Sequence, residues 1–177
     1  MLAMTDRLSV LGVSFDPVSR AQVMDRIAHF LESSEFHQIV TVGTEMVMHA
    51  QHDLDFRRVT NQAALVVPDG IGVVAAGRYC GYQVPDRVTG VDLTVAMATH
   101  FGPRARFFFL GGGPGVAEEA AAAVRHNYPG AQVVGIRDGF FKDDQEVVNQ
   151  IRQSGANILL VGIGFPRQEL WLEKNGP

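Results

Sequence analysis

Short apolar runs and longer segments with helical periodicity follow one another along the chain. The apolar runs that predict strands cover residues 8–15, 37–42, 64–67, 106–110, 131–136 and 157–163. Segments whose apolar residues recur every three or four positions predict helices at residues 19–33, 44–55, 71–79, 91–100, 116–127, 143–154 and 166–174. Several runs are apolar throughout, which is typical of strands buried on both faces. The pattern predicts an α/β fold, with a Rossmann-like, mainly parallel sheet and helices on both faces.

Turn-forming and capping residues separate these elements. Asp16-Pro17 is expected to start the first helix, with the Asp16 side chain as its cap and Pro17 suited to its first turn. The 177 residues contain no internal repeat, low-complexity segment or linker, and this length is typical of one domain. We therefore expect residues 1–177 to form a single domain.

In open parallel sheets, ligands bind outside the carboxyl ends of the strands. Five loops follow predicted strand ends, at residues 41–45, 68–70, 111–115, 138–141 and 162–169. The glycine-rich segment 111–115 would let backbone N–H groups approach a phosphate at the start of a helix, or it could simply be a tight connection. A dinucleotide fingerprint is only partial, because G-x-G-x-x-G counted from Gly111 places Val116 at the third glycine, although Asp138 could serve as the ribose-binding acid.

Two of these loops carry side chains suited to acid–base chemistry or sugar binding. Asp69 lies between Pro68 and Gly70, where a carboxylate could take a proton from a hydroxyl nucleophile or could only form the turn or cap the next helix. Gln168 and Glu169 follow the last strand, and they could bind sugar hydroxyl groups or form a solvated first helical turn. The residues alone leave both alternatives open.

Composition and charge exclude several classes of protein. The chain has 15 Lys and Arg against 19 Asp and Glu, a net charge of −4, which argues against sequence-independent binding to nucleic acid. The lone Cys80 can form neither an intrachain disulfide nor a cysteine-based zinc site, and it favours a reducing compartment. No apolar stretch reaches the roughly 20 residues of a membrane span, and the N-terminus lacks the apolar core of a secretory signal. Any membrane contact should therefore be peripheral.

The sequence predicts no metal site. Asp53-Leu54-Asp55 has the D-x-D spacing of cation-binding nucleotide-sugar enzymes, but it falls inside a predicted helix, where residues two apart diverge. His49 and His52 lie close to this pattern, and the remaining histidines, His29, His37, His100 and His126, are scattered and show no ligand spacing. The sequence also contains neither G-x-x-x-x-G-K-[ST] nor G-x-S-x-G, so NTP hydrolysis and acyl transfer are poorly supported.

Five segments, taken in order, resemble motifs of the WecG/TagA/CpsF family of bacterial glycosyltransferases, and the match spans nearly the whole chain. They are residues 41–45 (TVGTE), 68–72 (PDGIG), 86–93 (DRVTGVDL), 108–117 (FFLGGGPGVA) and 162–169 (GIGFPRQE). The resemblance implies transfer of a sugar, such as N-acetylmannosamine or glucose, from a UDP donor to an undecaprenyl-diphosphate-linked acceptor. It implies inversion, no metal or other cofactor, and action at the cytoplasmic face of the membrane in wall or surface polysaccharide synthesis.

The resemblance also implies roles for individual residues. Asp69 matches the proposed general base, and Thr41 and Gln168 match residues of the sugar site. The UDP moiety would be held by Gly111, Gly112, Gly113, Pro114, Gly139 and Phe140, with Arg87 as an anion contact. The remaining motif residues expected to line the substrate cleft are Gly43, Glu45, Asp92, Gly164 and Glu169.

The chain departs from the family pattern in two places. Gly43 stands where the family commonly has asparagine, and the chain stops at Pro177, where members usually continue into a basic C-terminal segment that touches the membrane. We expect weak turnover from the chain as written, because only helix N-termini and Arg87 or Arg137 would stabilise the departing UDP. The alternatives are a non-catalytic nucleotide-sugar-binding subunit and an NAD-dependent oxidoreductase. The subunit count, including a homo-oligomer, stays open.

Overall fold

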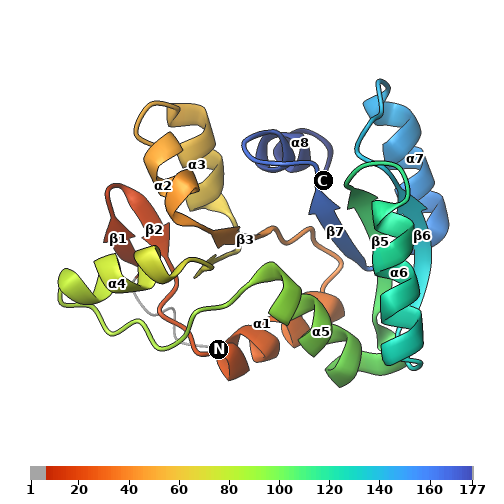
Figure 1. The fold of residues 1–177 in the computed structure, drawn as a ribbon, viewed down its shortest axis with the longest axis horizontal. Helices are drawn as coiled ribbons and strands as arrows, with labels where there is room; N and C mark the ends of the chain where they lie inside the picture. The colour runs from red at the N-terminus through yellow and green to blue at the C-terminus, as the bar shows by residue number, and fades with distance from the viewer. Residues whose placement is uncertain (1–6, 177) are drawn as a thin grey trace. The chain divides into compact units, whose positions relative to one another are not determined.

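Residues 7–176, the part of the chain that the computed structural model describes, form seven strands and eight α-helices (Figure 1). By their contacts these residues divide into two compact units. The first unit comprises residues 7–93 and 169–176, and the second is Thr94–Gln168. Two helices, α5 (Gly90–Phe101) and α8 (Arg167–Asn175), contribute residues to both units.

The first unit contains an antiparallel hairpin and a parallel pair of strands. Its elements are β1 (Leu8–Val10), β2 (Val13–Phe15), α1 (Arg20–Glu32), β3 (Ile39–Val42), α2 (Thr44–His49), α3 (Leu54–Gln62), β4 (Leu65–Pro68) and α4 (Ile71–Tyr79). Strand β3 pairs with β4 in parallel, with Val42 opposite Pro68. The core of this unit gathers apolar residues of β1–β4 and α2–α4, among them Phe15, Met46 and Phe56.

The predicted single strand over residues 8–15 is wrong, because the chain turns back within it. Leu11 and Gly12 have φ angles of 50° and 80°, as a tight hairpin turn with two left-handed residues requires. Strands β1 and β2 therefore pair antiparallel, with Val10 opposite Val13. The apolar residues continue on both sides of the turn, so the hydrophobic pattern alone does not show it.

Asp16 does not cap α1, contrary to the sequence prediction. Ser19 is the cap, in a reciprocal capping box with Gln22. Asp16 is instead only 4% exposed, and its carboxylate accepts hydrogen bonds from Arg26 Nη1 at 2.9 Å and the Val66 N–H at 2.8 Å. The Asp16 N–H also donates to the Val66 carbonyl at 2.8 Å. Asp16 thus binds β4 along the edge opposite to β3.

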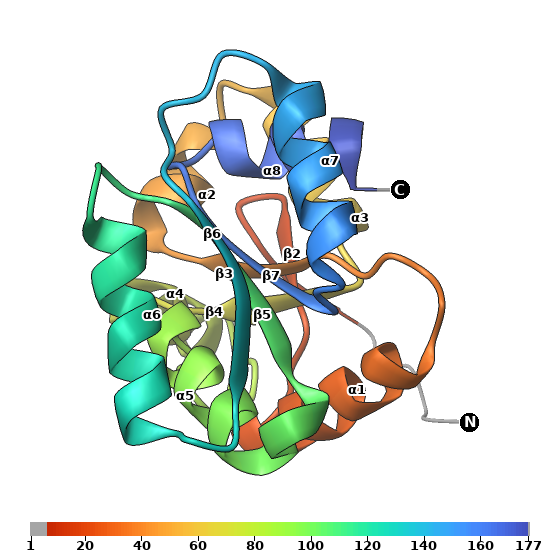
Figure 2. The ribbon, with the colours of Figure 1, turned by 90° about the vertical axis from the view of Figure 1, so that its right-hand side faces the viewer.

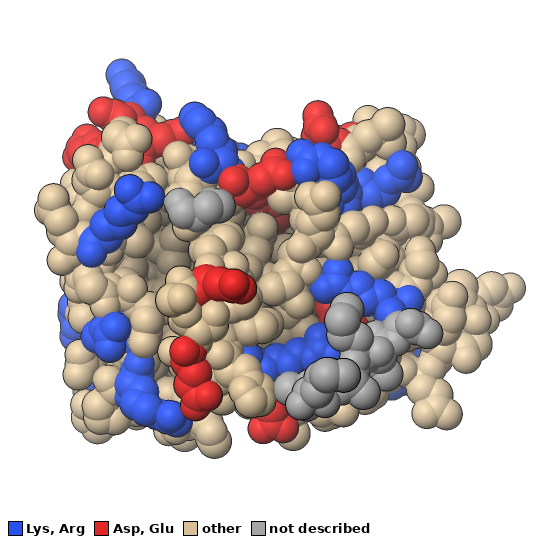
Figure 3. All heavy atoms as spheres, turned by 180° about the vertical axis from the view of Figure 1, so that it is seen from behind, with Lys and Arg blue, Asp and Glu red and all other residues tan. Residues whose placement is uncertain are grey.

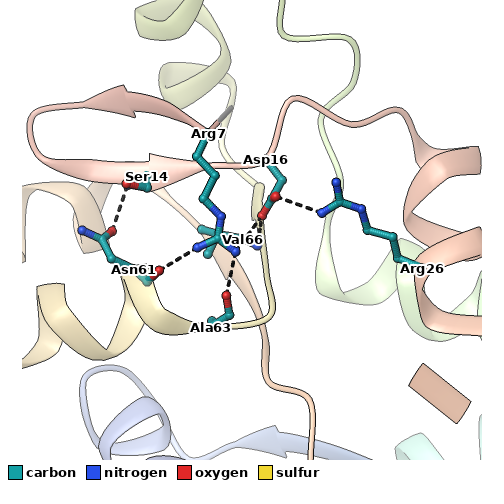
Figure 4. A network of polar contacts seen from close by, with 7 residues as sticks. All are labelled: Arg7, Ser14, Asp16, Arg26, Asn61, Ala63 and Val66. Carbon is teal, nitrogen blue, oxygen red and sulfur yellow. Dashed lines mark hydrogen bonds and ion pairs between the residues drawn. The ribbon is translucent and has the colours of Figure 1, made fainter. Parts of the chain in front are cut away.

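Arg7 completes this buried network (Figure 4). Its Nη2 lies 3.2 Å from Asp16 Oδ2, and its guanidinium donates to the carbonyls of Asn61 at 2.6 Å and Ala63 at 2.7 Å. The Asn61 side chain in turn accepts from the Ser14 N–H at 2.9 Å. One carboxylate therefore joins the hairpin, α1, the end of α3 and the start of β4.

The predicted continuous helix over residues 44–55 is also wrong. Helix α2 ends at His49, and α3 begins only after Asp53, whose carboxylate accepts from the Phe56 N–H at 2.9 Å. An aspartate is a favourable N-cap residue when its carboxylate accepts from the N–H group three residues later, which has no partner within the helix. This interruption turns the chain so that Val47 and Phe56 both face the core.

The second unit is a three-stranded parallel sheet with helices on both faces. Its strands are β5 (Arg106–Gly111), β6 (Gln132–Arg137) and β7 (Ile158–Gly162), in the order β6-β5-β7. Its helices α6 (Val116–Asn127) and α7 (Asp144–Ser154) lie on opposite faces of this sheet (Figure 2), and a short 3₁₀ helix (Gly102–Arg104) precedes β5. The predicted α/β fold with parallel strands is confirmed. Within residues 7–176, no helix is long and apolar enough to span a bilayer.

Candidate active site

The five loops singled out from the sequence all follow the carboxyl ends of strands. Residues 41–45 and 68–70 lie at the carboxyl ends of β3 and β4 in the first unit. Residues 111–115, 138–141 and 162–168 follow β5, β6 and β7 in the second unit. The sequence-predicted positions of the loops are therefore correct.

Asp69 is the first residue after β4, and its backbone is held on both sides. Its N–H donates to the Val42 carbonyl at 2.9 Å, and the carbonyl of the preceding Pro68 accepts from the Val88 N–H at 2.9 Å. The residue is half-buried. Within residues 7–176 the Asp69 carboxylate has neither a hydrogen-bond nor an ion-pair partner. Gly70, not Asp69, is the cap residue of α4, so the Asp69 carboxylate is available to a ligand.

Glycines allow three segments of the first unit to approach this strand end closely. A Cβ atom added to Gly72 would lie 2.6 Å from Thr44 Oγ1, and one on Gly70 would lie 3.4 Å from the same oxygen. A Cβ atom on Gly90 would lie 3.7 Å from Thr41 Oγ1. The starts of α4 and α5 thus lie against the end of β3 and the start of α2. Thr41 lies within the last two residues of β3, opposite Val67, and Asp69 directly follows β4, so both lie at the paired ends of the same two strands. Thr44 is not among the residues predicted for the site, although the Gly70–Gly72 spacing is a signal that a side chain approaches there.

The other predicted residues of the first unit differ in their exposure and in whether their side chains have partners. Glu45 is exposed in the first turn of α2, and Arg87 is exposed and has no ion-pair partner among residues 7–176. Asp92 is partly engaged, because its carboxylate lies 3.4 Å from Arg20 Nη2. Gly43 has an ordinary extended backbone, and a Cβ there would lie 3.0 Å from Glu45 Oε2. A Cβ atom at position 43 would need only this exposed side chain to move.

Glycines are required at the start of the loop that follows β5. Gly111, Gly112 and Gly115 have φ angles of 140°, 69° and 89°, and a Cβ on Gly111 would lie 2.3 Å from the Gly162 carbonyl oxygen. The Gly112 N–H donates to that same oxygen at 3.0 Å. Gly115 is the cap residue of α6 and offers no side chain to its first-turn N–H groups. Such N–H groups can bind an anion, next to the exposed Pro114 and the half-buried Gly113.

The strand order makes this end of β5 a favourable place for a ligand. From the central β5 the chain passes through α6 to β6 on one side, and then through α7 on the opposite face to β7 on the other side. Ligands of open α/β sheets bind where the connections of neighbouring strands diverge in this way. The loops of β5 and β7 meet at this point through Gly112 and Gly162.

The loop that follows β6 presents an exposed aromatic ring. The buried Gly139 donates its N–H to the Gly112 carbonyl at 2.9 Å. Phe140 is 78% exposed, and its N–H donates to Asp138 Oδ1 at 2.8 Å. The Asp138 carboxylate is thus engaged within its own loop, and this weakens its interpretation as the ribose-binding acid of a dinucleotide site.

The loop that follows β7 contains the remaining predicted residues. Gly164 has a φ of 85°, and its carbonyl accepts from the Gln168 N–H at 2.9 Å. Gln168 is half-buried, and Glu169 is 2% exposed. The interpretation of Gln168 and Glu169 as a solvated helical turn is therefore wrong for Glu169. Arg167 is not among the residues predicted for the site, and its side chain contacts Gly139 and Phe141 of the loop after β6.

The D-x-D aspartates have structural partners. Asp53 caps α3 and lies 3.2 Å from His49 Nε2, and its pKa is lowered chiefly by the hydrogen bond from the Phe56 N–H. Asp55 lies 3.7 Å from Arg58 Nε. Residues 7–176 contain no group of three or more His, Cys, Asp or Glu residues placed to hold a metal ion.

Charged side chains of both signs are interspersed on the face shown in Figure 3. The local groups that could bind an anion are the exposed Arg87 in the first unit and the N–H groups at the start of α6 in the second unit.

Fold and loops together define an α/β protein whose candidate ligand-binding loops lie at the carboxyl ends of parallel strands. Residues 8–177 match the sequence model of the Glycosyl transferase WecG/TagA/CpsF family, and the chain belongs to this family. The resemblance noted from the sequence is thus confirmed.

Two similar proteins carry the same name, N-acetylglucosaminyldiphosphoundecaprenol N-acetyl-β-D-mannosaminyltransferase. The protein of Bacillus spizizenii is 30% identical over 146 residues, which cover 82% of this chain and 57% of the relative. That of Staphylococcus aureus is 29% identical over 175 residues, which cover 95% of this chain and 67% of the relative. The chain therefore spans 57% to 67% of the length of these relatives.

Proposed function

We propose that this chain carries the catalytic machinery of a glycosyltransferase that moves a sugar from a UDP donor to an undecaprenyl-diphosphate-linked acceptor. The transferred sugar is of the N-acetylmannosamine type or glucose. The names of both relatives state a lipid-linked N-acetylglucosaminyl acceptor and an N-acetylmannosaminyl group. With such an acceptor the reaction would occur at a membrane, and we propose that the protein acts at the cytoplasmic face, bound peripherally.

Asp69 is the general base in this proposal. Its carboxylate takes the proton of the acceptor hydroxyl while that oxygen attacks the anomeric carbon of the donor. The bond from the anomeric carbon to UDP breaks in the same displacement, UDP leaves with the electron pair, and the configuration inverts. The observation that carries this role is a half-buried carboxylate without a partner among residues 7–176, on a backbone fixed at Val42. A base of this kind contributes about 10²–10⁴-fold to the rate.

Binding of the donor is assigned to the remaining loops. In the second unit, the N–H groups at the start of α6 are suited to a phosphate group, and the exposed ring of Phe140 is suited to stack on uracil. In the first unit, the exposed Arg87 is the proposed anion contact. Thr41 and Gln168 would bind the hydroxyl groups of the sugar. The proposal requires no metal ion, because these groups would carry the charge of the departing UDP.

A panel of UDP-sugars tests the proposal directly. Each donor is incubated with a soluble polyprenyl-diphosphate-linked N-acetylglucosamine analogue, and release of UDP and the glycosylated product are both measured. Product formation with one donor, lost in Asp69→Asn, supports the transferase. UDP binding without any product, also in a variant in which Gly43 is replaced by asparagine, would favour the non-catalytic binding subunit instead.

A further inference from the structure

Arg167 links two of the candidate donor-binding loops within the second unit. It is the first residue of α8, directly after the loop that follows β7. Its Nη1 donates to the Gly139 carbonyl at 3.2 Å. Its guanidinium carbon lies 4.8 Å from the centre of the Phe141 ring, within the range of a cation–π contact. Arg167 thus contacts the loop after β6 at two successive points, on either side of Phe140.

The contacted loop is fixed from a second direction as well. The Gly139 N–H donates to the Gly112 carbonyl, so both sides of this residue are bonded. A Cβ atom on Gly139 would lie 3.2 Å from that same oxygen, so the approach is close. Phe141 is 8% exposed and anchors the other end of the segment. Between these fixed residues, Phe140 is 78% exposed.

An exposed aromatic ring on a backbone that is already fixed by hydrogen bonds is preorganised to stack on a flat ligand. Fixing the loop before binding removes the entropy cost of ordering it in the complex. We propose that Arg167 is a positioning residue, which holds residues 139–141 so that the Phe140 ring can stack on the nucleobase of the donor. This inference rests on the proposed function, since it takes the ligand to be a nucleoside diphosphate sugar. Arginine suits the role better than lysine, because its planar group can donate to a carbonyl and cover a ring at the same time.

The test separates positioning of the loop from direct contact with the diphosphate. Calorimetric titration gives the dissociation constants of UDP and of uridine for the wild type, Arg167→Gln, Arg167→Lys and Phe141→Leu. If Arg167 positions the loop, Arg167→Gln should weaken the binding of UDP and of uridine by the same factor, about tenfold, because both ligands carry the base. Phe141→Leu should reproduce this loss, and the double variant should be no weaker than either single variant. Arg167→Lys should lie between wild type and Arg167→Gln.

Lys142→Gln is the matched control, because it removes a positive charge from an exposed residue of the same loop. It should leave both dissociation constants unchanged. Hydrogen exchange gives a readout without ligand. The N–H groups of Gly139 and Phe140 should exchange faster in Arg167→Gln than in the wild type, because the segment is no longer held.

Several results would overturn the inference. Weaker UDP binding with unchanged uridine binding would show that Arg167 contacts the diphosphate itself. If Arg167→Gln changes neither the binding of the two ligands nor the hydrogen exchange of the loop, Arg167 has no positioning role. If Arg167→Gln does not fold, Arg167→Lys and Phe141→Leu carry the same comparison. A wild type that binds neither ligand would refute the nucleotide function as a whole, whereas a wild type that binds both without sensitivity to Arg167 would refute only the positioning role.

Discussion

The N–H of Asp69 donates a 2.9 Å hydrogen bond to the carbonyl of Val42. This bond follows the parallel pairing of β4 with β3, in which Val42 lies opposite Pro68. The backbone of the proposed base is therefore fixed by the sheet, and the side chain begins where the sheet ends. Replacement of the carboxylate should change the chemistry without disturbing the pairing.

Asp69→Asn is expected to abolish transfer and leave the fold intact. The amide cannot accept the proton of the acceptor hydroxyl, so the turnover number should fall at least 100-fold, on the order of the contribution of a general base. Binding of UDP should change little, because the nucleotide is assigned to other loops. Product formation and calorimetric UDP titration on the same preparation measure the two effects.

Asp25→Asn is a suitable control, because Asp25 is an exposed carboxylate of α1. It should transfer at the wild-type rate. Full activity of Asp69→Asn would remove Asp69 from the role of base, and an equal loss in both variants would point to a general effect of charge.

Gly111→Ala should destabilise the protein far more than Gly113→Ala. A Cβ atom at position 111 would lie 2.3 Å from the Gly162 carbonyl oxygen, on a backbone with a φ of 140°. At position 113 a Cβ would meet nothing within 4 Å. We expect Gly111→Ala to lower the free energy of unfolding by at least about 2 kcal/mol, and Gly113→Ala to change it by less than about 0.5 kcal/mol. Urea denaturation of both variants checks this, and similar midpoints would contradict the close approach of the two strands.

The positions of the candidate loops could be predicted because local signals mark them. Pro68-Asp69-Gly70 and the glycines after β5 interrupt the apolar pattern where the strands end, so the bounds of α4 and α6 follow from the sequence. Family resemblance, rather than local pattern, distinguishes Asp69 as a base from Asp69 as a turn residue. The structure adds that Gly70 is the cap residue of α4 and that the Asp69 carboxylate stays available.

Features that depend on distant partners could not be predicted. Asp16 has the local surroundings of a helix cap, but its partners Arg26 and Val66 lie 10 and 50 residues away. The contact of Arg167 with the Gly139 carbonyl spans 28 residues. No spacing rule connects such pairs, since they meet only when the strands are arranged in sheets. An aspartate that caps a helix and an aspartate that forms a buried ion pair therefore cannot be told apart from the local sequence.

The buried carboxylate of Asp16 should matter more for stability than an exposed one. Asp16→Asn leaves Arg7 and Arg26 without their shared counter-charge in a largely buried position, and such losses cost about 3–5 kcal/mol. Asp92→Asn breaks the exposed ion pair with Arg20 and should cost less than about 1 kcal/mol. Urea denaturation near neutral pH measures both variants. Equal losses would show that Asp16 contributes no more than a surface charge.

The ion pair between Arg58 and Glu173 predicts how pH affects the attachment of α8 to α3 within the first unit. Arg58 donates to both Glu173 carboxylate oxygens, and this hydrogen bonding lowers the pKa of Glu173 below its ordinary value of 4.5. A carboxyl group whose pKa is depressed by folding stabilises the folded state above its ordinary pKa, and this stabilisation is lost as the pH falls through the lowered pKa. Wild type should therefore be more stable than Glu173→Gln at pH 7.

The stability difference between wild type and Glu173→Gln should shrink as the pH falls below 4.5, because protonated Glu173 no longer attracts Arg58. Both side chains are partly exposed, so the difference at pH 7 should be small and should also decrease in high salt. Arg58→Gln should show the same pH dependence as Glu173→Gln, since either change removes the pair. Urea denaturation of the three proteins between pH 3 and pH 7 measures this. A difference that stays constant over the range would mean that Glu173 contributes through packing of its side chain and not through its charge.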